Sequence, residues 1–335
     1  MVTAIRRHGL WVAVLGLGLS LSSSLAVGRY PVPPQAALAI LAAKLGGAAS
    51  LWPPEMTTVL MKIRLPRILG AIEVGAALAV SGSAYQGLFR NPLVSPDILG
   101  VSAGAGFGAA LAILLRADAV TIQLAAFFAG LLAVALTSLA GLSRAGVLVM
   151  ILAGVIVGTV FSAGISLVKF AADPNNVLPA ITFWLMGSLA SVRMAEVAVA
   201  ALPITVGIGG LLLLRWRLNL LCFGDEEARS LGVNVPLARM LVILCATLAT
   251  ASAVAISGVI GLVGLVVPTL ARLLVGPDHR RLIPCAILMG GGYLLLVDDL
   301  ARALLPVELP LGILTSLLGA PLFLFLLFRT RRAWA

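Results

Sequence analysis

The chain has very little charge for its length. Only 11% of its 335 residues are Asp, Glu, Lys or Arg, whereas a soluble globular domain carries roughly 25%. Hydrophobic residues make up 61% of the chain, and the mean hydropathy is +1.13. These values exclude an ordinary soluble fold and indicate an integral membrane protein. The net charge of +10 comes from basic residues scattered between apolar runs, so we interpret it as loop charge and expect no nucleic acid partner.

Residues that carry out chemistry are also scarce. The three cysteines, Cys222, Cys245 and Cys285, are scattered and form no CxxC motif, which argues against a disulfide framework. The two histidines, His8 and His279, have no carboxylate or cysteine at metal-ligand spacing. We therefore expect no site for a bare metal ion and no directly bound cofactor.

Motifs for catalysis and nucleotide binding are missing as well. The dipeptide Gly-Lys never occurs, so the chain has no phosphate-binding loop of the G-x-x-x-x-G-K-[ST] type. It also has no H-E-x-x-H motif, and no paired catalytic carboxylates stand out. We expect a protein that is not an enzyme. If ATP drives it, the ATPase is a separate chain.

Apolar windows long enough to cross a membrane recur along the whole chain. They predict an all-α polytopic fold with about ten transmembrane helices in a single domain, residues 1–335. The predicted spans are 9–27, 66–88, 98–115, 119–140, 146–168, 195–214, 237–256, 258–275, 282–298 and 309–328. Two shorter apolar stretches, 36–49 and 180–192, are predicted to be interfacial or re-entrant. Within the eighth span, Pro268 frees a backbone carbonyl, which requires packed neighbours or a wet path at that depth.

The basic residues indicate an orientation. The apolar run after Arg6 and Arg7 resembles a signal peptide, but an even number of spans requires it to be retained as the first helix. Ten spans place both termini on one side, and the larger share of the Lys and Arg residues falls there. The positive-inside rule assigns that side to the cytoplasm. Lys62, Arg64 and Arg67 form a basic cluster on the opposite side, which topology does not explain.

The longest predicted cytoplasmic loop runs from about residue 215 to 239 and contains a short predicted helix. Asp225 suits a helix N-terminus, Ala228 and Leu231 fall on one face, and Gly232 ends the helix. Such a helix is either a handle for a partner protein or an ordinary solvated loop helix.

Three acidic residues lie in or at the ends of predicted spans: Glu73, Asp298 and Asp299. Carboxylates in a membrane are costly and are usually paired or functional. Asp298 and Asp299 lie close in sequence to Arg302, so a local ion pair is expected. Proton coupling through Glu73 or Asp298 is the alternative.

Six ordered stretches of the sequence resemble one family, the FecCD-type permease subunits of the type II ABC importers for iron–siderophore complexes, haem and vitamin B12. They are residues 64–67, 87–104, 183–188, 224–232, 258–272 and 308–321. The family often has histidine after the proline of its Gly-Leu-x-x-Pro motif, whereas this chain has Thr269. Any family role of that side chain is therefore in doubt here.

The resemblance implies a set of partners and sites. It implies a second permease subunit, with a homodimer expected, two cytoplasmic ATPase subunits that bind ATP, and a periplasmic or lipid-anchored binding protein. It assigns binding-protein docking to Arg64, Arg67 and Arg302, and a cytoplasmic gate to Asn91 and Leu93. The fifth span would line the transport path. The resemblance assigns ATPase coupling to Gly224, Asp225, Glu226, Glu227, Ala228, Leu231 and Gly232.

These features together predict the permease of an ATP-driven importer in the bacterial inner membrane. The segment from Phe183 to Ser188 is more similar to iron-chelate members of the family than to vitamin B12 members, so an iron chelate is the expected substrate. Haem, vitamin B12 or an oxyanion are alternatives within the family. A secondary transporter driven by ions is a more distant alternative, and an intramembrane enzyme is disfavoured by the missing catalytic set.

Overall fold

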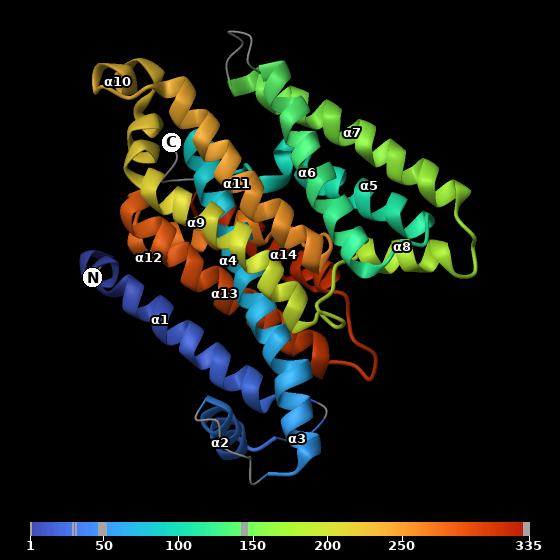
Figure 1. The fold of residues 1–335 in the computed structure, drawn as a ribbon. Helices are drawn as coiled ribbons and strands as arrows, with labels where there is room; N and C mark the ends of the chain where they lie inside the picture. The colour runs from blue at the N-terminus through green and yellow to red at the C-terminus, as the bar shows by residue number, and fades with distance from the viewer. Residues whose placement is uncertain (1, 29, 31, 46–51, 142–146, 331–335) are drawn as a thin grey trace.

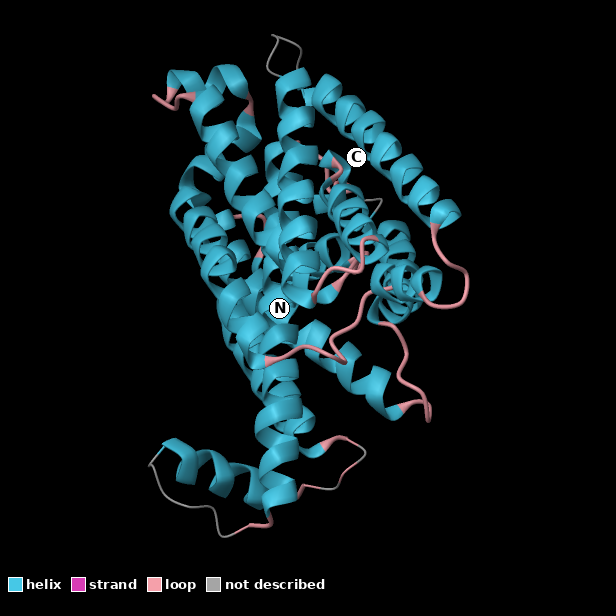
Figure 2. Cartoon of the chain, turned by 45° about the vertical axis from the view of Figure 1, so that its right-hand side comes forward, coloured by secondary structure: helices cyan, strands magenta, loops and turns pink. Residues whose placement is uncertain are grey.

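The computed structural model describes residues 2–28, 30, 32–45, 52–141 and 147–330. The described residues form helices and loops without any strand (Figure 2). The helices are α1 (Val2–Ala26), α2 (Pro34–Leu45), α3 (Pro54–Thr58), α4 (Leu65–Leu88), α5 (Val101–Leu114), α6 (Ala119–Gly141), α7 (Val147–Ala171), α8 (Val177–Leu185), α9 (Met194–Phe223), α10 (Asp225–Ser230), α11 (Val235–Ser257), α12 (Val263–Val275), α13 (His279–Ala303) and α14 (Leu311–Thr330). A π-helical segment (Val59–Arg64) joins α3 to α4, and a 3-10 turn (Pro96–Leu99) precedes α5.

Each of the ten predicted spans coincides with a helix, which confirms the predicted all-α architecture. Seven helices of the described chain are long and apolar enough to cross a membrane, and α5, α12 and α14 are shorter apolar helices. The two stretches predicted to be too short for a crossing form α2 and α8, with 12 and 9 residues. Residues 46–49 and 146 of the predicted ranges lie outside the described residues.

The second span begins earlier than the sequence predicts. Its helical path starts at Pro54 and runs without a break for 35 residues to Leu88, a length of about 52 Å at 1.5 Å per residue. The wider π-helical turn ends at Arg64, two residues before Pro66, which has no N–H to donate. The first turns therefore extend past the roughly 30 Å apolar layer.

Helix α4 is the centre of the bundle, and α9, α11, α12 and α13 pack around it. Glycines permit the closest crossings: Gly75 lies against the backbone of Gly290, and Gly82 lies against the backbone of Gly264. Small residues of this kind let membrane helices approach until their backbones touch. A second group, α5 to α8, packs beside this centre on the right in Figure 1.

The bundle has two ends that carry different features (Figure 1). One, here called the α10 end, carries α10, the turn after α4 and the corner between α12 and α13. The opposite α3 end carries α2, α3, the start of α4 and the end of α13. Gly9, near the start of α1, lies against Leu274 and Val275 at the end of α12. Helix α1 thus begins at the α10 end.

Candidate functional site

The predicted coupling helix is present as α10 and stands at the end of the bundle. Gly224 has φ +133 and Gly232 has φ +81, so both flanking turns use backbone conformations that favour glycine. Ala228 is fully buried against the bundle, and Asp225 pairs with Arg239 at 3.0 Å. These contacts fix the helix to α9 and α11 while its polar face stays free.

The exposed face of α10 carries two carboxylates. Glu226 and Glu227 are both solvent exposed, as a partner-binding surface requires. Leu231, which the sequence places on one face of the helix with the buried Ala228, is itself 61% exposed. The helix ends at Ser230, and Leu231 has the non-helical angles of a cap, which turn its side chain outward. An apolar side chain is thereby left uncovered beside the two acids.

The predicted gate residues form a tight turn after α4. The side-chain oxygen of Asn91 accepts a hydrogen bond of 2.9 Å from the backbone N–H of Leu93. Arg90, directly before them, has φ +51, which is uncommon for a residue with a side chain. The Leu93 side chain is 53% exposed. The structure therefore places Asn91 and Leu93 together at the surface of the α10 end.

The three predicted docking arginines lie together at the α3 end, but their side chains are not exposed. Arg64, Arg67 and Arg302 are 3%, 3% and 8% exposed, whereas docking to another protein needs accessible guanidinium groups. Arg67 pairs with Asp298 at 2.8 Å and with Glu308 at 2.8 Å. All three arginines therefore use their charge or their hydrogen-bond donors in contacts within the chain.

The partners of these arginines come from distant parts of the sequence. Arg302 pairs with Asp298 at 3.2 Å and with Asp299, which confirms the predicted local ion pair. Arg302 also donates to the Ser24 hydroxyl of α1 at 2.8 Å. Arg64 donates to the backbone carbonyl oxygens of Leu25 and Tyr30. The network therefore joins α1, α4, α13 and the loop after α13.

The carboxylate of Glu73 stands apart from this network. One of its oxygens is buried without a hydrogen-bond partner among the described residues. The residue lies in α4 and forms none of the ion pairs found in the described chain. Among the described residues, no ion pair links Glu73 to a second titratable group that could act in a proton relay.

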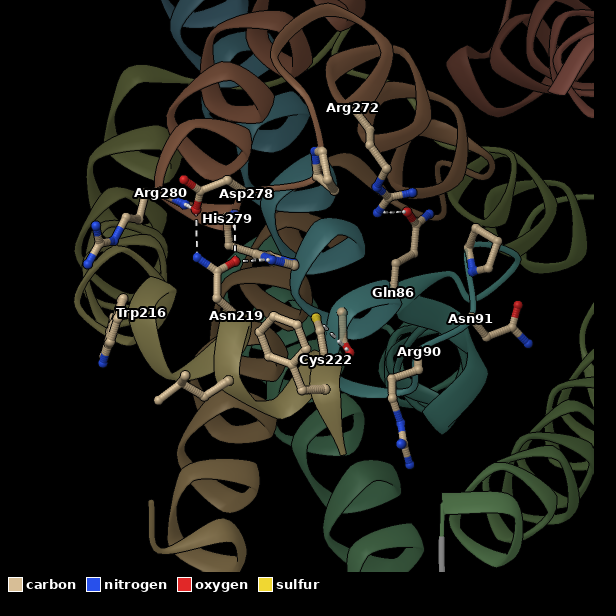
Figure 3. A pocket seen from close by; sticks show the side chains of 15 residues that line it. Gln86, Arg90, Asn91, Trp216, Asn219, Cys222, Arg272, Asp278, His279 and Arg280 are labelled. Atoms are coloured by element: carbon tan, nitrogen blue, oxygen red, sulfur yellow. Dashed lines mark hydrogen bonds between the residues drawn. The ribbon is translucent and has the colours of Figure 1, made fainter. Parts of the chain in front are cut away.

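A pocket of about 670 Å³ opens at the α10 end (Figure 3). It lies between the end of α4 with the gate turn, the end of α9 and the corner between α12 and α13. Arg272 donates from Nη2 to the side-chain oxygen of Gln86 at 2.9 Å on one side of the pocket. On the other side the guanidinium of Arg280 lies over the ring of Trp216, 4.3 Å from its centre.

The side-chain amide of Asn219 forms hydrogen bonds that connect the residues at the base of this pocket. The side-chain oxygen of Asn219 accepts from the backbone N–H of His279 at 2.8 Å, and its nitrogen donates to Asp278 at 2.6 Å. Asp278 also accepts from the backbone N–H of Arg280, at the start of α13. These hydrogen bonds lower the pKa of the Asp278 carboxyl although its partial burial acts in the opposite direction. Sequence reasoning missed this pocket because its walls come from four separated segments.

The sequence profile of the FecCD transport family matches residues 16–329. The chain belongs to the FecCD transport family. The molybdate import permease MolB of Haemophilus influenzae is 42% identical over 311 residues, 92% of each chain. A probable iron chelatin permease of Helicobacter pylori (strain 26695) is 42% identical over 278 residues, 83% of this chain and 84% of the relative. The hemin permease HmuU of Yersinia pestis is 43% identical over 286 residues, 82% of this chain and 85% of the relative.

Solved structures agree with the FecCD assignment. An inward-facing structure described as a metal-chelate type ABC transporter superposes with a TM-score of 0.85 at 40% identity, covering 96% of this chain and 98% of that one. PsaBC from Streptococcus pneumoniae shares the fold at 21% identity, with a TM-score of 0.54, over 78% of this chain and 90% of that one. The FecCD chain is therefore a multi-pass ABC importer permease, a transport subunit. Its relatives are named for molybdate, iron chelates and haem, so family membership alone does not select the substrate.

Proposed function

We propose that this permease imports an iron chelate into a bacterial cell. Two relatives named as probable iron chelatin permeases, from two Helicobacter pylori strains, are each 42% identical over 278 residues. The solved structure with a TM-score of 0.85 is described as metal-chelate type. The segment 183–188, which we interpreted as iron-chelate-like, lies at the corner between α8 and α9. This agreement carries the proposal.

The proposed energy source is a pair of separate ATPase subunits docked on α10. The observation that carries this assignment is the anchoring of α10 through Ala228 and the Asp225–Arg239 pair while Glu226 and Glu227 face solvent. A short helix tied to both α9 and α11 transmits a displacement to two membrane spans. We place α10 and both termini in the cytoplasm, in the bacterial inner membrane.

A second copy of the chain and a binding protein complete the proposed importer. Helix α7 exposes a long apolar face that includes Leu152, Val155, Ile156 and Val160, each more than half exposed. We propose that this face meets the second subunit at the transport path. The binding protein would dock at the α3 end. Direct contact with Arg64, Arg67 and Arg302 stays a prediction, and their burial means that docking would have to break intramolecular bonds.

Molybdate is the second candidate substrate. It is supported by the 42% identity to MolB across 92% of both chains, a longer match than that of the iron chelatin relatives. A molybdate importer has the same partners and the same use of ATP, so only the cargo differs.

Uptake by reconstituted proteoliposomes tests the proposal. The permease, its two ATPase subunits and the binding protein are supplied with a ⁵⁵Fe-labelled chelate or with radioactive molybdate. ATP-dependent uptake of the iron chelate alone is expected. Uptake of molybdate alone would move the assignment to the second candidate. Uptake that persists without ATPases but collapses with the ion gradient would overturn the ABC mechanism.

A further inference from the structure

The lining of the pocket at the α10 end carries three arginines and one carboxylate. Arg90, Arg272 and Arg280 all line it. Within the part of the chain that the structure describes, none of the three takes part in an ion pair. The only acidic residue of the lining, Asp278, already accepts hydrogen bonds from Asn219 and from the backbone of α13. The pocket therefore has an excess of positive charge.

Arg272 lines this pocket and has an unmet hydrogen-bond donor. Its Nη2 donates to Gln86, but its Nη1 is buried and has no partner among the described residues. A buried guanidinium nitrogen without an acceptor is costly. At the α3 end the buried arginines Arg67 and Arg302 each reach a carboxylate. Buried arginine charge is thus paired with carboxylates at the α3 end, whereas Arg272 at the α10 end forms no ion pair among the described residues.

The wall that α9 contributes carries large apolar side chains and continues into an exposed apolar face of that helix. Trp216, Leu220 and Phe223 line the pocket from α9. Leu202 and Leu213 precede them at helical spacing on the same face, and Leu213 is 86% exposed. Because α9 is 30 residues or about 45 Å long, its last turns lie near the headgroup level of a bilayer. Apolar walls do not help to bind a free inorganic anion, whereas a lipid has both a charged headgroup and apolar chains.

We propose that this pocket binds the phosphate headgroup of an anionic phospholipid. Arg272 supplies the buried donor, Arg90 adds positive charge beside the gate turn, and Arg280 is held at the entrance by its contact with Trp216. Arginine forks match phosphate oxygens, and basic pockets between membrane helices bind anionic headgroups. The acyl chains lie along the exposed apolar face of α9. The site rests on the proposed function only for its assignment to the cytoplasmic leaflet.

The proposed site adjoins three elements, namely the gate turn, the start of α10 and the corner between α12 and α13. Arg90 precedes the gate turn at Asn91, and it lies close to Gly224 at the start of α10. A headgroup bound in the pocket therefore lies between the gate turn and the corner between α12 and α13. We expect the bound lipid to stabilise this corner of the bundle.

Native mass spectrometry of the full-length permease tests the site. The delipidated protein in detergent is titrated with dioleoyl-phosphatidylglycerol or dioleoyl-phosphatidylcholine, and retained lipid is counted. Wild type should retain phosphatidylglycerol selectively. Arg272→Gln and Arg280→Gln should each weaken that binding about fivefold, the factor expected for one basic residue at a membrane surface. Arg229→Gln, which removes an exposed arginine at the same end outside the pocket, should bind as wild type does. Arg280→Lys should restore most of the affinity.

Three outcomes would overturn the proposal. The first is equal retention of the two lipids by the wild-type protein. The second is unchanged phosphatidylglycerol binding in both glutamine variants, including the exposed Arg280→Gln, which is not expected to unfold. The third is displacement of the lipid by millimolar inorganic phosphate, which would make the pocket a site for a free oxyanion. Because lipid retention needs no transport, failure here would leave the proposed function untouched.

Discussion

Removing the charge of Asp298 should unfold the α3 end of the permease. The Asp298 side chain is fully buried and forms ion pairs with Arg67 at 2.8 Å and with Arg302 at 3.2 Å. Three arginines and three carboxylates balance one another there: Arg64, Arg67 and Arg302 against Asp298, Asp299 and Glu308. Asp298→Asn keeps the side-chain shape but leaves the cluster with one uncompensated positive charge.

The expected cost follows from burial. Breaking a buried ion pair by removing one partner costs about 3–5 kcal/mol, because the other charge stays buried and unpaired. An exposed pair is worth about 0–1 kcal/mol. The pair between Arg193 and Glu196, in which Arg193 is 68% exposed, provides the matched control. Asp298→Asn should therefore destabilise the protein several-fold more than Arg193→Gln.

Unfolding in mixed micelles of dodecyl maltoside and increasing SDS measures the difference. A double-mutant cycle with Arg67→Gln isolates the coupling between Arg67 and Asp298, and the double variant should recover part of the loss. A loss for Asp298→Asn no larger than for Arg193→Gln would refute the reasoning from burial. The same logic changes the expectation for charge reversal at Arg67: folding should fail before any docking defect can be measured.

Three further predictions concern the coupling helix, the helix crossings and the eighth span. Alanines at Glu226 and Glu227 should leave the permease folded but weaken substrate-stimulated ATP hydrolysis, and unchanged hydrolysis would count against α10 as the coupling site. Gly82→Ala should lower the thermal unfolding temperature because its methyl group would overlap the backbone of α12. Gly209 has open space around it, so Gly209→Ala should be neutral or stabilising by up to about 1 kcal/mol. Thr269→Ala should leave ATP-driven uptake within about twofold of wild type, because the hydroxyl bonds only to the preceding turn of its own helix; a loss above tenfold would show a transport role.

The sequence was sufficient to predict the spans and the short helix α10 because both depend on local patterns. Apolar length marks a membrane helix, and Gly224 and Gly232 bracket α10 at positions whose φ angles favour glycine. The short stretches at α2 and α8 were predicted from their length for the same reason.

The state of the arginines could not be predicted because it depends on contacts between distant residues. Arg67 pairs with Asp298 across 231 positions of sequence, so Arg64 and Arg67 of the basic cluster are buried, whereas Lys62 is exposed. The outward turn of Leu231 depends on where α10 ends, which is the least predictable property of a short helix. The pocket lined by Arg90, Arg272 and Arg280 depends on the packing of four segments that are separated in the sequence, so no local pattern indicates it.

The shortness of α12 has a consequence for how the protein is made. Its 13 residues span about 20 Å, two thirds of the apolar layer, and the chain before it is not helical. Backbone bonds at that depth are completed elsewhere, with the Ser188 N–H donating to the Ser257 carbonyl and the Leu311 N–H to the Gly187 carbonyl. Leu311 follows α12 in the sequence and is therefore synthesised after it. We therefore expect α12 to enter the bilayer only as a hairpin with α13, and to reach its final depth after α14 has been synthesised.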